Sequence, residues 1–327
     1  MTEIEMVEAA TAQPGVATLS EYAAHLAGSG VRVFPGDDGL FWTSYESGTL
    51  MRLPTFHVGP TGAGEVARVL RAAKKAVASY LIEPDAKHPA NAFLYVCADP
   101  EYALEKLPSA MRRNVRRGLK ELTITPFGAD ELQRHGLEAF CDTRRRTGVS
   151  DGTPEGFRAY FAARSHLPEV SYLGAWKGDE LAAFLTIVRV DDWAELGCFS
   201  RDAFLQYRPN DTLMYSALAQ FLGGGECRLV SYGLSSIQAE SNAAGLHRFK
   251  LKVGFEARPV HRAFVTHPTL RPLANPLTLA AAHTGVKAAL RLRPGDRRLK
   301  KAGGMLACMR GETWMMAIAA GDATDDE

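Results

Sequence analysis

The chain contains 327 residues, 46% of them hydrophobic and 23% charged, and its formal net charge is +1. This length predicts two domains, or one domain with two lobes, and the nearly neutral charge excludes a generally basic surface, so any nucleic-acid site must be local. Five widely spaced cysteines without a C-x-x-C pair argue against a disulfide framework and a zinc site. No apolar run approaches the roughly 20 residues of a membrane span, and the acidic N-terminus lacks the apolar segment of a secretory signal. We therefore expect a soluble, cytoplasmic protein.

The first third of the chain predicts short strands around two helices. Residues 1–16 have the composition of a disordered leader. Capping residues, Gly/Pro/Asp turns and the spacing of apolar residues predict the elements that follow. In chain order these are a helix in 18–30, a three-stranded meander in 31–54, a helix in 62–76, and strands at 77–84 and 91–97.

The remaining sequence predicts helices packed on antiparallel strands. Pro108 lies near the start of the second of two helices in 101–122, where its missing N–H costs nothing. The clearest strand signal is a three-stranded meander in 169–200, with turns at 177–179 and 191–192. The other predicted elements are a strand at 122–128, helices in 129–149 and 153–166, a helix in 211–225 capped by Asp211 or Thr212, a strand at 227–234, a helix at 241–251 and a strand at 254–267. This order is typical of an α+β sheet covered by helices.

A resemblance to a known family follows from four stretches of sequence. The element order from Val170 to Val265 resembles that of the GNAT superfamily of acyltransferases. The segment GLHRFKLKVGFEA at 245–257 resembles the FemAB-like branch, the peptidoglycan-bridge aminoacyltransferases, in which Gly-x-x-x-Phe-Lys leads into a Gly-Phe or Phe-Gly turn. Residues 111–128 resemble the Arg/Asn-rich helix and strand that join the two lobes of that branch, and 204–236 resemble its helix and strand ending in Tyr-x-Gly. The likeness covers 107–267 well and the N-terminal lobe by element order alone.

Lys250 is the leading catalytic candidate. A lysine at a helix end beside a glycine turn can point its ammonium group into a cleft where a sheet opens, and there stabilise an oxyanion or bind phosphate. Phe249 would pack behind it, and Gly254 would allow the turn. The alternative is a solvated basic helix face, since Arg248, Lys250 and Lys252 recur at every second residue.

The stretch MRRNVRRGLK at 111–120, in the second of the two helices predicted in 101–122, carries two basic stripes. Arg112, Arg116 and Lys120 recur at helical spacing, and Arg113 lies on the adjacent stripe. Such stripes can bind the phosphates of a nucleotide-linked substrate or of a tRNA backbone. The alternative is a solvated helix face paired with nearby glutamates.

The segment before the predicted helix at 211 departs from a CoA-binding loop. Standard GNAT enzymes hold pyrophosphate on the backbone amides of a glycine-containing loop that opens a helix. Here Tyr207, Arg208, Asn210 and the neighbouring residues include no glycine, and Asp211 places negative charge where a phosphate would lie. The departure is compatible with the FemAB-like branch, whose acyl donor is typically an aminoacyl-tRNA, and it leaves acyl-CoA open.

A few further polar residues are candidates. Tyr232 ends a predicted buried strand and could donate a proton to a leaving group, or satisfy a backbone carbonyl. Ser235 and Ser236 follow it and could contact substrate. The nine histidines show no ligand spacing, so we expect no metal and no tightly bound cofactor.

We therefore expect an α+β fold of the GNAT-like acyltransferase type, with two related lobes, one of them incomplete, and mixed central sheets. The expected divisions are a leader at 1–16, an N-terminal lobe at 17–106, a C-terminal acyltransferase lobe at 107–267, and an extension with an acidic tail at 268–327.

The implied function is transfer of an acyl or aminoacyl group to an acceptor amine, which attacks the activated carbonyl directly. A CoA-dependent N-acetyltransferase and a non-catalytic GNAT-like binding module remain alternatives. The implied partners are a small-molecule, nucleotide-linked or lipid-linked amine and, as one candidate donor, tRNA, without DNA. Any membrane contact would be peripheral, through the basic and partly amphipathic residues 286–301, because Pro294-Gly295 interrupts that segment.

Overall fold

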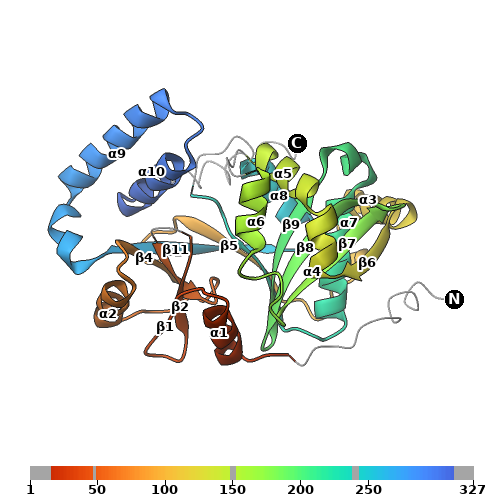
Figure 1. The fold of residues 1–327 in the computed structure, drawn as a ribbon, viewed down its shortest axis with the longest axis horizontal. Helices are drawn as coiled ribbons and strands as arrows, with labels where there is room; N and C mark the ends of the chain where they lie inside the picture. Colours follow the sequence, from red (N-terminus) through yellow and green to blue (C-terminus); the bar gives the residue numbers. More distant parts are fainter. Residues whose placement is uncertain (1–15, 47–48, 148–151, 238–242, 313–327) are drawn as a thin grey trace.

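A computed structural model describes residues 16–312, apart from 47–48, 148–151 and 238–242. Its centre is one mixed sheet of eleven strands in the order β1-β2-β3-β4-β11-β5-β10-β9-β8-β7-β6 (Figure 1). Helices pack on both faces of this mixed sheet. The expected leader, apart from Val16, and the acidic tail lie outside the described residues.

The N-terminal half contains a meander followed by a crossover to a parallel strand. Helix α1 (Leu19–Gly28) begins with a capping box between Thr18 and Glu21. The next elements are β1 (Val33–Pro35), β2 (Phe41–Glu46) and β3 (Thr49–Leu53), then α2 (Ala63–Ala73) and β4 (Val77–Ile82). Strands β1, β2 and β3 pair antiparallel, and β4 pairs parallel with β3. The apolar face of α2 packs under the sheet against Trp42 and Leu50.

The C-terminal half repeats this order. After η1 (Leu104–Lys106), α3 (Ser109–Glu121) and β6 (Thr123–Phe127) come α4 (Ala129–His135), α5 (Leu137–Arg146) and α6 (Pro154–Phe161). The meander is β7 (Val170–Lys177), β8 (Glu180–Val190) and β9 (Trp193–Ser200), and α7 (Pro209–Leu218) then leads to β10 (Leu229–Leu234). Strands β7, β8 and β9 pair antiparallel and β10 pairs parallel with β9, which confirms the predicted meander with a parallel neighbour.

The two halves exchange their last strands. β5 (Ala92–Cys97) follows β4 in the chain but pairs with β10 of the C-terminal half. After α8 (Ala243–Lys252), the long strand β11 (Glu256–Thr266) pairs through its first part with β5 and through its second part with β4. The antiparallel pair of β5 and β11 therefore lies at the middle of the sheet and joins the halves.

The meander of the C-terminal half is buried on both faces. Because side chains alternate along a strand, Leu185 and Ile187 of β8 face the core under α7, whereas Phe184 faces the opposite core. That opposite core contains Phe140 of α5 and Phe161 of α6. Helix α7 therefore covers one face of this half, and α5 and α6 cover the other.

Three predicted helices differ from the structure. The single helix expected in 129–149 is broken at Gly136, which ends α4 and precedes α5; glycine is a poor helix former. The helix expected from residue 211 begins at Pro209, whose fixed φ suits a first helical position, so Asp211 and Thr212 lie inside α7 and do not cap it. Of the first helix expected in 101–107, only the short 3-10 turn η1 forms.

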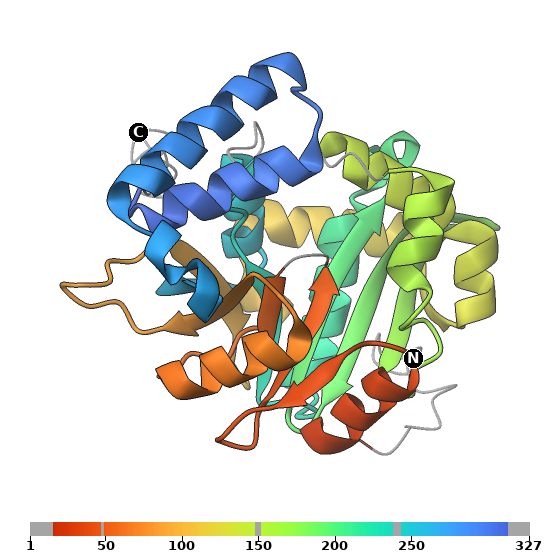
Figure 2. The ribbon, with the colours of Figure 1, turned by 60° about the vertical axis from the view of Figure 1, so that its left-hand side comes forward.

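The last described elements form a helical hairpin. Turn η4 (Pro268–Leu273) leads into α9 (Pro276–Leu292), and α10 (Arg297–Met309) runs back along it, between α9 and the sheet (Figure 2). The break between the helices contains Pro294 and Gly295, as predicted. None of the helices in the described part of the chain is long and apolar enough to cross a membrane.

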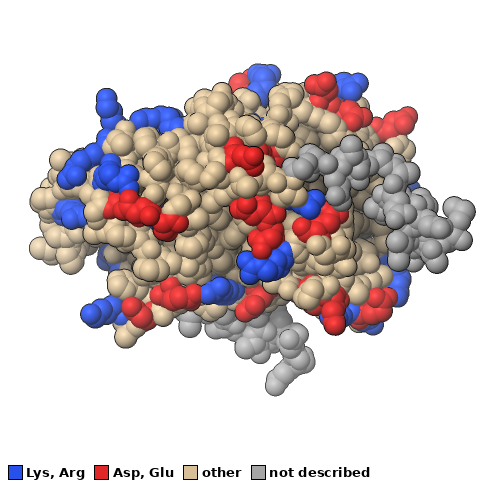
Figure 3. All heavy atoms as spheres, turned by 90° about the horizontal axis from the view of Figure 1, so that it is seen from below, with Lys and Arg blue, Asp and Glu red and all other residues tan. Residues whose placement is uncertain are grey.

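Charges of both signs share the surface. On the face shown in Figure 3, Lys and Arg side chains lie among Asp and Glu side chains. Ion pairs such as Arg68 with Asp37 and Arg258 with Glu83 illustrate this mixture. No single-sign patch covers the described part of that face, in agreement with the net charge of +1.

Candidate functional site

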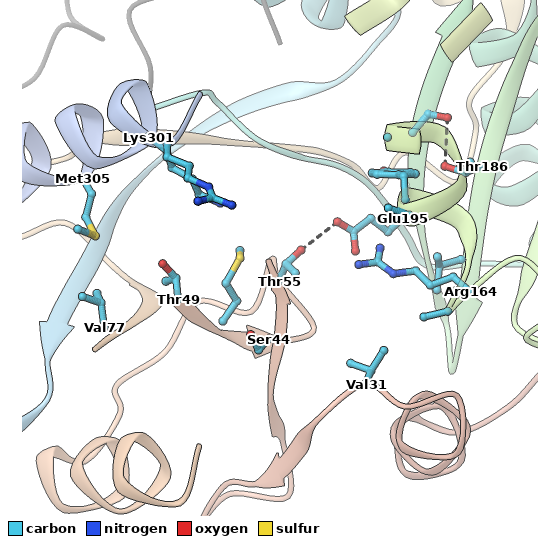
Figure 4. Close-up of a pocket in the computed structure, with 18 of the residues that line it drawn as sticks. Val31, Ser44, Thr49, Thr55, Val77, Arg164, Thr186, Glu195, Lys301 and Met305 are labelled. Atoms are coloured by element: carbon cyan, nitrogen blue, oxygen red, sulfur yellow. Dashed lines mark hydrogen bonds between the residues drawn. The ribbon is translucent and has the colours of Figure 1, made fainter. Parts of the chain in front are cut away.

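A large cavity lies between the two halves of the molecule. Its volume is about 1300 Å³, and its walls come from β3, the α6 region, β8, β9 and α10. Figure 4 shows Lys301 and Met305 on the α10 side and Glu195 and Arg164 on the opposite side. The lining is mixed, with apolar side chains such as Val188 between the charged ones.

Glu195 is the acidic group on the β9 wall of this cavity. Its Oε1 accepts a hydrogen bond from Thr55 Oγ1 at 2.9 Å (Figure 4). Burial raises the pKa of the Glu195 carboxyl, while the hydrogen bond from Thr55 and the charge of Arg164 act in the opposite direction. A carboxyl whose pKa is raised toward neutrality is suited to accept and release a proton.

The Glu195 carboxylate lies where β9 and β10 separate. The two strands pair as far as Glu195 and Ser231, after which β9 continues beside β8 and β10 beside β5. Gly233 turns the backbone of β10 with φ of +70°, and a Cβ at this position would lie 4.0 Å from Glu195 Oε1. Both the left-handed backbone and the free space beside the carboxylate favour glycine here.

Lys250, at the end of α8, contacts β10 one residue before Gly233, at Tyr232. Its side chain is buried, with only 4% of the residue exposed, so it does not belong to a solvated basic face. Nζ donates to the carbonyl oxygen of Tyr232 at 3.3 Å and lies 3.8 Å from the centre of the Tyr95 ring and 4.6 Å from that of Tyr232. Because no carboxylate of the described residues pairs with it, burial lowers the pKa of Lys250 to about 7.

The other candidates near Lys250 have mainly structural contacts. Tyr232 stacks on Phe255 with ring centres 5.6 Å apart, and burial raises the pKa of its hydroxyl. Ser235 Oγ accepts from the N–H of Phe93 at 2.9 Å, and so continues the pairing of β10 with β5. Phe249 packs against the main core, as expected, and Ser236 is half-buried beside Ser235.

The residues before α7 surround its first turn. Arg208 is exposed and has a left-handed backbone with φ of 61°. Asn210 Oδ1 accepts from the Cys198 thiol at 3.3 Å, and the Tyr207 ring lies 4.9 Å from Lys177 Nζ. Asp211 is buried, which raises the pKa of its carboxyl, and its Oδ2 accepts from Asn114 Nδ2 at 2.8 Å.

Helix α3 covers that first turn. Asn114 reaches Asp211, and at Gly118 the two helices approach so closely that a Cβ would lie 1.8 Å from Thr212 Oγ1. Arg112 donates to the carbonyl oxygens of Glu105 and Leu107, and thereby fixes the turn before α3.

Arg113 and Arg116 point away from this contact. Both are exposed, and neither pairs with a carboxylate among the described residues. Two of the glutamates near this helix have other partners, since Glu121 pairs with Lys177 and Glu101 with Lys106.

The sequence candidates therefore separate into two groups. Lys250, Tyr232, Phe249 and Ser235 meet around β10, and Tyr207, Arg208, Asn210 and the α3 arginines meet around the start of α7. Sequence reasoning missed Glu195, Thr55 and Arg164, which line the cavity. The sequence did offer one sign of Glu195, because it is the one charged residue in the strand 193–200. Among the described residues, no cluster of His, Cys, Asp or Glu could hold a metal ion.

Solved structures resemble the chain at the level of the fold. A conserved protein of unknown function from Bacteroides thetaiotaomicron has a TM-score of 0.50 and 12% identity, over 77% of this chain and 92% of that chain. FemX has a TM-score of 0.49 and 11% identity, over 78% of this chain and 94% of its own. A GCN5-related N-acetyltransferase from Kribbella flavida has a TM-score of 0.41 and 11% identity, over 77% of this chain and 96% of its own. No protein-family model matches the chain, and no curated protein matches it in sequence.

The order of elements in the C-terminal half is a meander, a helix, a parallel strand, a helix and a last strand. This is the order that the resemblance implied, and the N-terminal half repeats its first part around the shared strands β5 and β11. The chain thus has an α+β fold with the GNAT-like order of elements.

Proposed function

We propose that the protein transfers an acyl group to an amine bound in the cavity, with Glu195 as the general base. The observation that carries this proposal is the position of Glu195, a half-buried carboxyl in the wall of a large cavity, at the point where β9 and β10 separate. An amine in the cavity would lie on one side of that opening. A donor arriving along α7 and α8 would lie on the other.

The reaction needs only one proton acceptor and an activated carbonyl. The amine nitrogen attacks the carbonyl carbon, a C–N bond forms, and the oxygen or sulfur of the donor leaves with the bonding electrons. Glu195 takes the proton that the amine loses, and the leaving oxygen or sulfur takes up one proton in turn, so the carboxylate is regenerated and no covalent enzyme intermediate is required. Its raised pKa makes it a stronger base than an exposed glutamate.

Lys250 has a positioning role in this proposal. Its hydrogen bond holds the carbonyl of Tyr232, which directly precedes Gly233 at the edge of the opening. The backbone there is thus fixed from the face opposite to Glu195.

The acceptor that we propose is an amine that also carries an anionic group. Arg298 and Lys301 of α10 line the cavity, and Lys301 lies across from Glu195 (Figure 4). Such cations would bind a phosphate or carboxylate while the amine faces Glu195. A nucleotide-linked or lipid-linked amine has this chemistry.

For the donor, we propose aminoacyl-tRNA ahead of acyl-CoA. Helix α3 packs on the first turn of α7, where a CoA pyrophosphate would otherwise bind backbone amides. Arg113 and Arg116 remain exposed on the outer side of α3 and are available for a phosphate backbone.

The test is transfer to a panel of primary amines with and without phosphate groups, with aminoacyl-tRNA or acetyl-CoA as donor, followed by mass spectrometry. We expect Glu195→Gln to lower kcat by about 10²–10⁴-fold, the usual contribution of a general base. In the wild type, kcat/KM should rise with pH through the pKa of Glu195. Thr55→Val removes a hydrogen bond that lowers this pKa, and should therefore move the rise to higher pH while activity is retained above it.

Full activity of Glu195→Gln would contradict the assignment of the base. Acetyl-CoA as the accepted donor would establish the alternative N-acetyltransferase. Binding of amine and donor without transfer would establish a GNAT-like binding module.

A further inference from the structure

The α9–α10 hairpin is far more basic than the molecule as a whole. Between Pro268 and Arg310 the chain has nine Arg and Lys residues and one acidic residue, Asp296, whereas the whole chain has a net charge of +1. Helix α9 is the outer helix of the hairpin in both ribbon views (Figures 1 and 2).

One face of α9 packs on α10. His283 is buried, with 4% of the residue exposed. Val286 and Leu290 lie beside Gly303 of α10, where a Cβ would be 3.4 Å and 3.9 Å from them. This inner face accounts for the apolar residues that hold the hairpin together.

The opposite face of α9 is exposed and mostly apolar, with Thr284 as a polar residue at its middle. Leu277 and Leu292 are 83% and 85% exposed, and Ala281 and Ala288 lie on the same side by helical spacing. Leu273, just before the helix, is 62% exposed. Large apolar side chains exposed to this degree along one line mark a contact surface.

Basic side chains border this exposed face. Lys287 and Arg291 are exposed and lie next to the apolar line on the helix surface, and Arg271 and Arg293 flank its two ends. None of these four pairs with a carboxylate among the described residues. An apolar line with a cationic edge is the arrangement of helices that lie in the plane of a membrane surface.

We propose that the outer face of α9 docks on the surface of an anionic phospholipid membrane. The leucines would enter the boundary between headgroups and acyl chains, and the cations would meet the lipid phosphates. A nucleic acid would satisfy the cations but leave the leucines in water. A second copy of the chain would cover the leucines but bring two strongly basic hairpins together, with unfavourable repulsion. The proposal does not depend on the reaction described above.

The test is co-sedimentation of the full chain with phosphatidylcholine vesicles that contain or lack phosphatidylglycerol, at low and physiological salt. We expect binding to the anionic vesicles and little to the neutral ones. Lys287→Gln with Arg291→Gln should weaken it by about fivefold per charge. Leu277→Ser with Leu292→Ser should reduce binding at physiological salt to near the level of the neutral vesicles.

Matched controls use exposed residues elsewhere. Leu119→Ser on α3 (44% exposed) controls for loss of a surface leucine, and Arg71→Gln with Lys74→Gln controls for loss of two charges. Both should bind like the wild type, and circular dichroism should show that every variant is folded. The proposal is overturned if the wild type does not bind anionic vesicles, or if the leucine variant binds them as well as the wild type does. If the leucine variant still binds and the protein also binds RNA, the surface is a site for a polyanion. A concentration-dependent dimer that the leucine variant abolishes assigns it to a second copy.

Discussion

Lys250 lies in a local sequence motif, but its environment differs from the one that the motif suggests. Its ammonium group lies between two tyrosine rings and one carbonyl oxygen, without a carboxylate. Ring faces attract a cation, but they replace little of the water that burial removes. The lowered pKa expresses this balance, and it makes the stability of the protein depend on pH.

Replacement of Lys250 by methionine should stabilise the protein at neutral and lower pH. The folded state releases the Lys250 proton at about pH 7 and the unfolded state near pH 10.5, so between these values the unfolded chain holds more protons and the wild type gains stability as pH rises. At pH 6 the variant should be more stable by at most about 5 kcal/mol, because its folded state buries no charge. The difference should shrink toward pH 10, as measured by urea unfolding.

Lys252→Met provides the control, since Lys252 is exposed on the same helix. It should change the stability little at any pH. If Lys250→Met were less stable than the wild type at every pH measured, the prediction would be wrong. The two tyrosine rings would then stabilise the charged form of Lys250 in the folded protein.

The difference between Lys250 and Glu195 illustrates what sequence can reveal about single residues. Lys250 was found because it belongs to a local motif that ends in a glycine turn. Its burial was not readable, because the basic residues around it suggested a solvated face. Glu195 belongs to no motif, and its surroundings come from Thr55 and Arg164, both of which lie more than 30 residues earlier in the chain.

At the scale of elements, the contact between α3 and α7 decides what the start of α7 can bind. Gly118 is the point of closest approach, opposite Thr212, which is fully buried. The same contact brings Asn114 to Asp211. A larger residue at position 118 would push α3 away from α7.

Gly118→Ala should therefore destabilise the protein by about 1–3 kcal/mol, the usual cost of overpacking. Thr212→Ala should recover part of this loss when the two changes are combined, because it removes the hydroxyl that the new methyl meets. Urea unfolding of the single and double variants measures the coupling.

Gly64→Ala in α2 is the matched control. A Cβ there meets nothing within 4 Å, so the same substitution should stabilise the protein by about 0.5–1 kcal/mol. Equal losses at both positions would mean that the α3–α7 contact is not tight.

Most elements were predictable because their signals are local. The meander of β7, β8 and β9 follows from alternation and from two short turns. The start of α7 was misplaced by two residues, because Asp211 resembles a helix cap but is used to bind Asn114 of another helix. The partners of β5 could not be predicted, because its position depends on strands more than 100 residues later in the chain.

At the scale of the whole molecule, the exchanged strands join the two halves. β10 would be a sheet edge without β5, and β4 would be an edge without β11. A sheet edge exposes unpaired backbone groups, so each half would lose part of its hydrogen bonding if the other unfolded. The boundary that the sequence suggests near residue 106 therefore divides the chain into two segments, but the strands of both segments belong to one sheet.

The two halves should therefore unfold together. Hydrogen exchange measured by mass spectrometry at increasing urea can follow β2 and β3 of the N-terminal half and β8 and β9 of the C-terminal half in the same sample. Because β5 and β11 link these meanders through one continuous ladder, protection in both should disappear at the same urea concentration. The α9–α10 hairpin serves as an internal comparison; it lies outside the ladder and should open at a lower concentration. Loss of protection in β2 and β3 well before β8 and β9 would mean that the strand exchange does not couple the halves, and that each is stabilised mainly by its own core.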